Sequence, residues 1–164
     1  MKIRRAEKKD IPQIMKLLYQ VAEVHHVARP DLFRGNAAKY EPAELEEILA
    51  DEKKPIFAAV DEEDVLQGYA FCVVEEKKDN HVLVPVTSLY IDDLCVEEHQ
   101  RGTHIGSTLF EYVKEYARSI GCYDVTLNVW EGNDSAKAFY MSRGMRVMKT
   151  GMEYILEQEK EENA

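Results

Sequence analysis

The stretch HQRGTHIGSTLFEYV, residues 99–113, places two glycines and several polar side chains directly before an apolar repeat of helical spacing. A strand-like segment, residues 90–96, leads into it, and Ile105, Leu109 and Val113 begin the repeat. The first N–H groups of a helix have no partner inside the helix, and the helix dipole adds partial positive charge there. The stretch therefore predicts either a plain turn into a helix or a cradle for a phosphate group.

Two common nucleotide motifs do not occur in this stretch. A P-loop needs Lys followed by Ser or Thr at a fixed distance from its glycines, and the dinucleotide fingerprint needs Gly-x-Gly-x-x-Gly. Residues 99–113 contain neither pattern. This argues against a nucleotide-binding regulator, which would also need ligands for Mg²⁺.

Composition narrows the class of protein. The chain has 164 residues and a formal net charge of −10, which favours one acidic domain. Nucleic acid and anionic membranes bind clustered Lys and Arg, so neither is expected as a partner. The N-terminal residues MKIRRAEKKD are charged where a signal peptide would be apolar, which predicts a cytoplasmic location. Cys72, Cys95 and Cys122 are too far apart for a metal-binding pattern, so free thiols and no metal are expected.

Apolar periodicity and turn residues predict one α/β domain over residues 1–156 and a charged tail at 157–164. Strands are expected at residues 2–6, 55–60, 65–76, 82–96, 123–130, 145–149 and 153–156. Helices are expected after Asp10, over 41–51, from Ile105 to Ile120 and from Asn133 to Gly144. Hairpins dominate the first half and β-α-β order the second, which predicts a mixed sheet with helices on both faces.

A second pattern follows in LNVWEGNDSAKAFYMSRGM, residues 127–145. It has the form Asn-x-x-Ala-x-x-Phe-Tyr-x-x-x-Gly, and Gln-Arg-Gly-x-x-Ile-Gly precedes it at residues 100–106. Together, residues 88–146 resemble the GNAT superfamily of N-acetyltransferases. The first half of the chain matches that family only in the order of its elements. The resemblance implies a mostly antiparallel sheet of about seven strands, splayed between strands four and five.

The resemblance also implies a binding site for acetyl-CoA, without a metal. Backbone groups of three strand residues would pair with the pantetheine arm: Leu94, Cys95 and Val96. Amides of the turn would hold the pyrophosphate: Arg101, Gly102, Thr103, His104, Ile105, Gly106 and Ser107. Four residues of the second pattern would line the cofactor, the last also acting as general acid near the sulfur: Asn133, Ala136, Phe139 and Tyr140. His104 stands where the family usually has glycine, and it either contacts phosphate or faces solvent.

The acceptor side must supply a base, because a protonated amine cannot attack a thioester. The resemblance places that base at Tyr90 or Asp92, which share one face of a regular strand, while Asp93 would form a structural hydrogen bond or contact the acceptor. A β-bulge would exchange these assignments. Asn128 is a candidate for orienting an amine or water. His26 is either a ligand of the acceptor or a surface side chain beside a loop.

The function expected from these residues is transfer of an acetyl group from acetyl-CoA to a primary amine of a small molecule or peptide. The amine would attack directly in a ternary complex. The alternative is a non-catalytic acyl-CoA-binding sensor. An exposed sheet edge or the splayed face also favours a homodimer.

Overall fold

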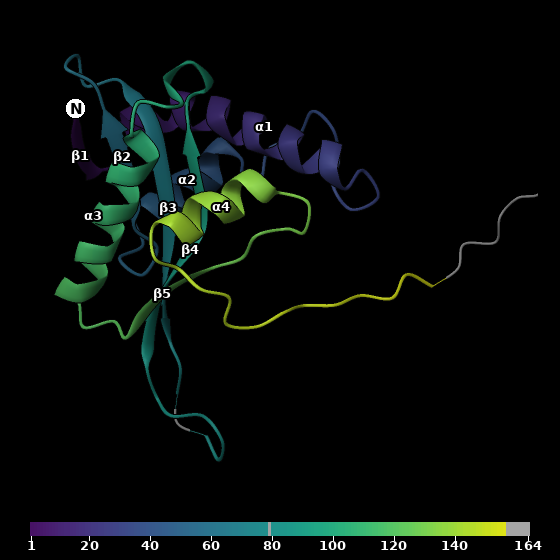
Figure 1. Cartoon of the computed structure of the whole chain (residues 1–164). Helices are drawn as coiled ribbons and strands as arrows, with labels where there is room; N and C mark the ends of the chain where they lie inside the picture. Colours follow the sequence, from purple (N-terminus) through teal and green to yellow (C-terminus); the bar gives the residue numbers. More distant parts are fainter. Residues whose placement is uncertain (79, 157–164) are drawn as a thin grey trace, which may run out of the picture. The chain divides into compact units, whose positions relative to one another are not determined.

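The computed structural model describes residues 1–78 and 80–156 (Figure 1). The chain divides into two compact units, Met1–Asn133 and a second that starts at Asp134, and each is described by itself. The predicted charged tail, residues 157–164, lies outside the described residues. None of the described helices has the length and apolar character of a membrane span.

The elements of the first unit follow the predicted order. In sequence they are β1 (Lys2–Arg5), η1 (Lys8–Asp10), α1 (Ile11–Ala28), α2 (Pro42–Leu49), β2 (Ile56–Val60), β3 (Leu66–Glu76), β4 (Thr87–Val96), η2 (Glu98–Gln100), α3 (Ile105–Ser119) and β5 (Asp124–Leu127). The second unit contains α4 (Asp134–Ser142). Helix α1 begins after Asp10 as predicted, but the Asp10 carboxylate accepts hydrogen bonds from Arg4 and from the Glu7 amide instead of capping α1.

The five strands form one mixed sheet in the order β1-β2-β3-β4-β5. Strands β1 to β4 pair antiparallel with their neighbours, and β5 pairs parallel with β4. This last pairing covers only Ser88–Ile91 of β4 and Asp124–Leu127 of β5. Residues 92–96 of β4 continue without a described strand on that side, so the pairing of β4 with β5 ends at Ile91 and Leu127.

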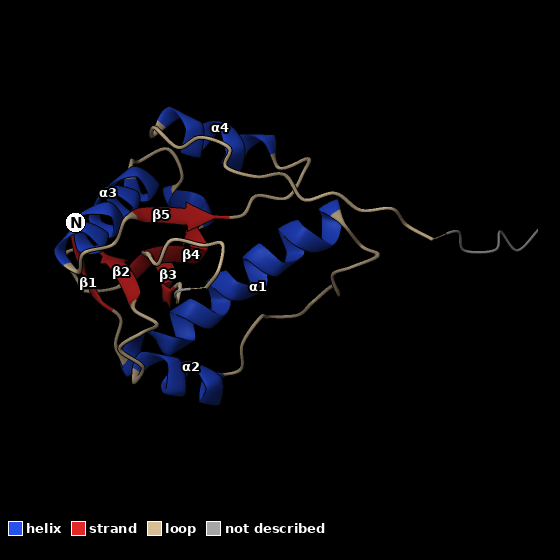
Figure 2. Cartoon of the chain, turned by 90° about the horizontal axis from the view of Figure 1, so that it is seen from below, coloured by secondary structure: helices blue, strands red, loops and turns tan. Residues whose placement is uncertain are grey.

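Helices cover both faces of the sheet within the first unit, as predicted. Figure 2 shows α1 and α2 on one side of the strands and α3 on the other. Tyr69 and Phe71 of β3 join the apolar cluster with α1 and α2. On the other face, α3 packs close to Gly68 of β3, where an added Cβ would lie 3.3 Å from the side chain of Leu109 and 3.0 Å from the Cys95 carbonyl. Glycine at this position therefore allows helix and sheet to approach.

The described residues contain five strands, and not the predicted seven. The two closing strands expected at residues 145–149 and 153–156 do not form. Alternating apolar residues favour a strand only where another strand supplies backbone partners, and an isolated two-stranded hairpin is marginal in water.

Candidate active site

The candidate site begins where the pairing of β4 with β5 ends. Tyr90 of β4 lies opposite Thr126 of β5, one residue before the pairing ends, and Asn128 follows the end of β5. The Asn128 side-chain amide donates a hydrogen bond to the Tyr90 hydroxyl over 3.2 Å. A predicted site residue of β4 and one that directly follows β5 therefore meet where the pairing ends.

A β-bulge follows in β4 and shifts the register of Asp92 and Asp93 against β3. Asp93 lies opposite Phe71, and Ile91 lies opposite the next residue of β3, so Asp92 is the extra residue of the bulge. Tyr90 and Asp93 are thereby paired with β3 residues two positions apart, which places them on the same face. The bulge therefore brings Asp93 to the face of Tyr90. Asp92 is hydrogen-bonded on that face as well, because its partner Tyr40 stacks on Phe71. The bulge considered in the sequence is present.

Asp93 is bound to a buried tyrosine of β3. The Tyr69 hydroxyl donates to the Asp93 carboxylate over 2.6 Å, and the Tyr69 side chain is inaccessible to solvent. Burial raises the pKa of Asp93 to about 6, although the Tyr69 hydrogen bond and the nearby Lys39 favour its charged form. Burial and the Asp93 charge raise the pKa of Tyr69, which therefore stays a proton donor. A carboxyl group with a pKa near 6 is suited to accept a proton at neutral pH.

Asp92 is bound by two residues from the segment between α1 and α2. Lys39 Nζ lies 2.7 Å from Asp92 Oδ1, and the Tyr40 hydroxyl donates to Oδ2 over 3.0 Å. Burial and the Asp92 charge raise the pKa of Tyr40, so its hydroxyl stays protonated. The two adjacent carboxylates therefore have different partners. The predicted role of Asp92 as the base stays a prediction.

The segment between α1 and α2 also contacts the residues that follow β5. The Phe33 ring lies 5.0 Å from the His25 ring and 5.3 Å from the Trp130 ring. His26 Nδ1 lies 2.6 Å from the Phe33 carbonyl oxygen, and an added Cβ at Gly35 would lie 3.1 Å from the other ring nitrogen. The His26 ring is thus packed within this segment, which is a structural contact, and its predicted contact with the acceptor stays a prediction.

The open half of β4 offers backbone groups to a ligand. The Glu97 amide donates to the Gln67 carbonyl on β3 over 2.8 Å, and hydrogen bonding alternates along an antiparallel pair. Cys95 therefore points its backbone groups toward β3, whereas Leu94 and Val96 point theirs toward the side that β5 leaves open. Of the three residues predicted to pair with pantetheine, Leu94 and Val96 have the required direction, and the Val96 carbonyl also accepts from the Gln20 side-chain amide over 3.3 Å.

The Cys95 side chain belongs to the core. It is 5% exposed and lies in the apolar cluster with α1, where its Sγ is 3.8 Å from the Gln20 side-chain amide. Burial and the Asp93 charge raise the pKa of Cys95 to about 12. The thiol is therefore protonated at neutral pH, which does not suit a nucleophile.

The turn before α3 has the geometry of an anion cradle. Gly102 has a φ of 82°, and α3 begins at Ile105. Among the described residues, none accepts a hydrogen bond from the backbone N–H groups of residues 103–107, and the first amide with a partner is that of Thr108, which donates to the His104 carbonyl. Arg101 at the start of the turn is exposed. These residues fit a pyrophosphate, because the unpaired amides and the start of the helix dipole coincide.

His104 adopts a left-handed backbone, with φ 67° and ψ 12°, as the residue before α3. This conformation costs an ordinary residue about 1 kcal/mol or more and costs glycine little. The left-handed backbone therefore explains why the resembled family usually has glycine at this position. The exposed His104 side chain leaves the neighbouring amides in place.

The second pattern lies mainly on α4 of the second unit. Helix α4 begins directly after Asn133, as predicted, and carries Ala136, Phe139 and Tyr140. The Phe139 and Tyr140 rings lie 5.1 Å apart. The predicted contacts of these four residues with the cofactor, and the acid role of Tyr140, stay predictions.

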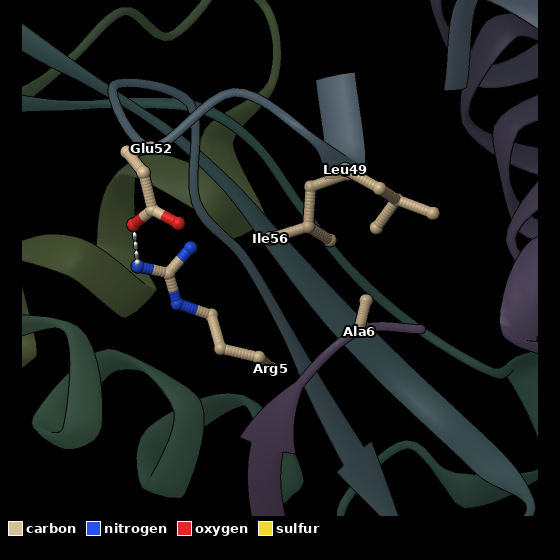
Figure 3. Close-up of a pocket in the computed structure, with 5 residues that line it drawn as sticks. All are labelled: Arg5, Ala6, Leu49, Glu52 and Ile56. Atoms are coloured by element: carbon tan, nitrogen blue, oxygen red, sulfur yellow. Dashed lines mark ion pairs between the residues drawn. The ribbon is translucent and has the colours of Figure 1, made fainter. Parts of the chain in front are cut away.

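One surface pocket of about 390 Å³ contains none of the predicted site residues. Arg5, Ala6, Leu49, Glu52 and Ile56 line it, and Figure 3 shows Arg5 facing Glu52, with 3.8 Å between their charged atoms. Over residues 1–78 and 80–156, the structure shows no group of three or more His, Cys, Asp or Glu side chains suited to a metal.

Four residues of the site carried no signal in the sequence: Gln20, Lys39, Tyr40 and Tyr69. They reach β4 from the first half of the chain, over separations of 24 to 76 residues. The sequence predicts Tyr69 as an ordinary residue of an apolar strand, and it predicts Lys39 and Tyr40 as part of a polar loop. Their roles depend on long-range pairing, which local patterns do not report.

The comparisons with known proteins identify the family and the fold. The acetyltransferase (GNAT) family model matches residues 21–160. A mutant of the BH1408 protein from Bacillus halodurans is 34% identical, with 95% of this chain and 99% of that chain covered and a TM-score of 0.91. A structure of glucosamine-6-phosphate N-acetyltransferase from Arabidopsis thaliana shares the fold at 21% identity, with 95% and 98% covered and a TM-score of 0.69.

An aminoglycoside N-acetyltransferase in complex with CoA also shares the fold, at 16% identity, with 96% of this chain and 100% of that chain covered and a TM-score of 0.69. No curated protein matches the sequence significantly. The family model and the 34% identical structure both extend over most of the chain. The chain therefore belongs to the GNAT family of acetyltransferases.

Proposed function

We propose that this chain transfers an acetyl group from acetyl-CoA to a primary amine, by direct attack within a ternary complex. The observation that carries the proposal is Asp93, whose pKa is raised to about 6 on the open half of β4. That carboxylate lies on the strand that leads directly into the turn with unpaired amides. A proton acceptor and an anion cradle on consecutive elements suit the transfer of an acetyl group from acetyl-CoA to an amine.

The cofactor would be held mainly by backbone groups. Leu94 and Val96 would pair with the pantetheine arm along the open side of β4, and the amides of residues 101–107 would bind the pyrophosphate. Acetyl-CoA supplies the activated thioester. Asn133, Ala136 and Phe139 would line its other side, as the family resemblance implies.

Proton transfer would involve one residue on each side of the reaction. An alkyl ammonium has a pKa of about 10, so the amine must lose a proton before its nitrogen attacks the acetyl carbon. Asp93 would accept this proton, with Tyr69 holding the carboxylate in position. As the carbon–sulfur bond breaks, Tyr140 would donate a proton to the leaving thiolate. Tyr90 and Asn128 would orient the amine or a water molecule between it and Asp93.

The test is release of free thiol from acetyl-CoA in the presence of a panel of primary amines. We expect thiol release that depends on both the amine and the enzyme, with the acetylated amine identified by mass. Binding of acetyl-CoA in calorimetry without amine-dependent release across the panel would overturn the proposal in favour of an acyl-CoA sensor.

We further propose that residues 1–156 act as one catalytic domain in the cytoplasm and associate as a homodimer. The exposed edges of a five-stranded sheet, β1 and β5, favour such association. Sedimentation at micromolar concentration tests the dimer, and a monomer there would remove that part of the proposal alone.

A further inference from the structure

An alkyl ammonium group already occupies the candidate acceptor side, and it belongs to the chain itself. Lys39 Nζ lies 2.7 Å from Asp92 Oδ1 and 5.5 Å from the centre of the Tyr40 ring. Carboxylates and aromatic faces both bind ammonium ions in proteins. The contacts around Lys39 Nζ are therefore those expected around the ammonium group of a small molecule.

The receiving groups are fixed more firmly than the lysine. The Tyr40 ring stacks on Phe71 with 5.7 Å between ring centres, and its hydroxyl holds the second carboxylate oxygen of Asp92. The Asp92 side chain is 18% exposed, whereas that of Lys39 is 49% exposed. Exposed ion pairs of a flexible lysine contribute little to stability, so the ammonium end can leave while Asp92 and Tyr40 stay in place.

We propose that Asp92 and Tyr40 form a subsite for the non-reacting ammonium group of an alkyl diamine acceptor, which Lys39 occupies when no acceptor is bound. This inference rests on the proposed acetyl transfer and names its substrate class. The acceptor displaces the Lys39 side chain and presents its other amino group to Asp93, the neighbouring residue.

The different partners of Asp92 and Asp93 explain why a diamine fits better than a monoamine. An amine paired with Asp92 is held in its protonated form and cannot attack the thioester. Asp93 faces Tyr69 and has a different environment, so it is left to accept a proton from a second amino group. One group of the acceptor is thus recognised as an ammonium, and the other reacts as a neutral amine.

The experiment compares 1,5-diaminopentane with 1-aminopentane, which has the same carbon chain and lacks the second amino group. For the wild-type protein we expect kcat/KM for the diamine to exceed that for the monoamine by at least about tenfold. In Asp92→Asn the ratio should fall to about one, because the charge that distinguishes the two amines has been removed.

Two lysine variants provide an independent measurement. Lys39→Met removes the internal ammonium and keeps much of the aliphatic chain, so KM for the diamine should fall about two- to fivefold, the range of an exposed ion pair. The matched control is Lys53→Met, because Lys53 forms an exposed ion pair with Glu76 outside the candidate site. It should leave KM for both amines at the wild-type value.

The outcomes separate the two proposals. Turnover of both amines with a ratio near one in the wild-type protein overturns the diamine subsite and leaves acetyl transfer intact. An unchanged ratio in Asp92→Asn, or an unchanged KM for the diamine in Lys39→Met, also overturns the subsite. Absence of thiol release with every amine overturns both proposals together.

Discussion

Replacing Asp93 by Asn should make the folded protein more stable at alkaline pH. The pKa of Asp93 is raised from its usual 3.8 to about 6, so the folded state holds the proton more firmly than the unfolded state does. The stability that this group contributes is present below pH 4 and is lost as the pH rises to about 6, a loss of about 3 kcal/mol for a shift of about two pKa units. Asn stays neutral and can still accept the Tyr69 hydrogen bond.

Asp93→Asn should therefore be up to about 3 kcal/mol more stable than the wild-type protein at pH 8 and equal to it at pH 4. Urea unfolding of both proteins at the two pH values measures the difference. The same change should lower kcat by about 10²- to 10⁴-fold, the usual contribution of a positioned base. The rise of wild-type kcat/KM through pH 6, where Asp93 ionises, should be absent in the variant.

Two results would refute this reasoning. A less stable Asp93→Asn at pH 8 would mean that the carboxylate serves the fold as the acceptor for Tyr69. A wild-type pH profile in the variant would move the base to Asp92 or to water. Tyr69→Phe is the matched test, because loss of a hydrogen bond that favours the charged carboxylate should raise the pKa of Asp93 and move the acid limb above pH 6.

Three further predictions concern the turn before α3 and the proposed acid Tyr140. His104→Gly should change stability by less than about 1 kcal/mol, because relief of the left-handed backbone is offset by the greater freedom of unfolded glycine, and calorimetry should show less than a tenfold change in acetyl-CoA affinity. Gly106→Glu should weaken acetyl-CoA at least about tenfold more than the neutral Gly106→Gln, and equal affinities would argue against a phosphate cradle. Tyr140→Phe should lower kcat about 10²- to 10⁴-fold at unchanged acetyl-CoA affinity; unchanged kcat with a loss of about 1 kcal/mol in thermal unfolding would make Tyr140 structural.

Local patterns in the sequence were sufficient for the helices and for most of the strands. Helix α3 has buried residues at its apolar positions, from Ile105 to Ala117, and begins and ends close to the predicted residues. The segment at 145–156 has strand-like alternation but forms no strand, because alternation does not supply a backbone partner. Helical hydrogen bonds are made within a segment, and strand hydrogen bonds are made with another one, so prediction from local pattern is weaker for strands.

The positions of the site residues depend on a one-residue shift in the register of β4 against β3. No local pattern in the sequence predicts such a shift. Asp92 and Asp93 are chemically identical neighbours, and a regular strand would place Asp92 on the face of Tyr90. The bulge in β4 brings Asp93 to that face as well, because Asp93 pairs opposite Phe71 and Asp92 is the extra residue. One carboxylate consequently meets the buried Tyr69 hydroxyl and the other meets the Lys39 ammonium. Environment, and not residue type, thus separates the two roles, because burial disfavours charge at Asp93 while a cation and a hydroxyl hold Asp92.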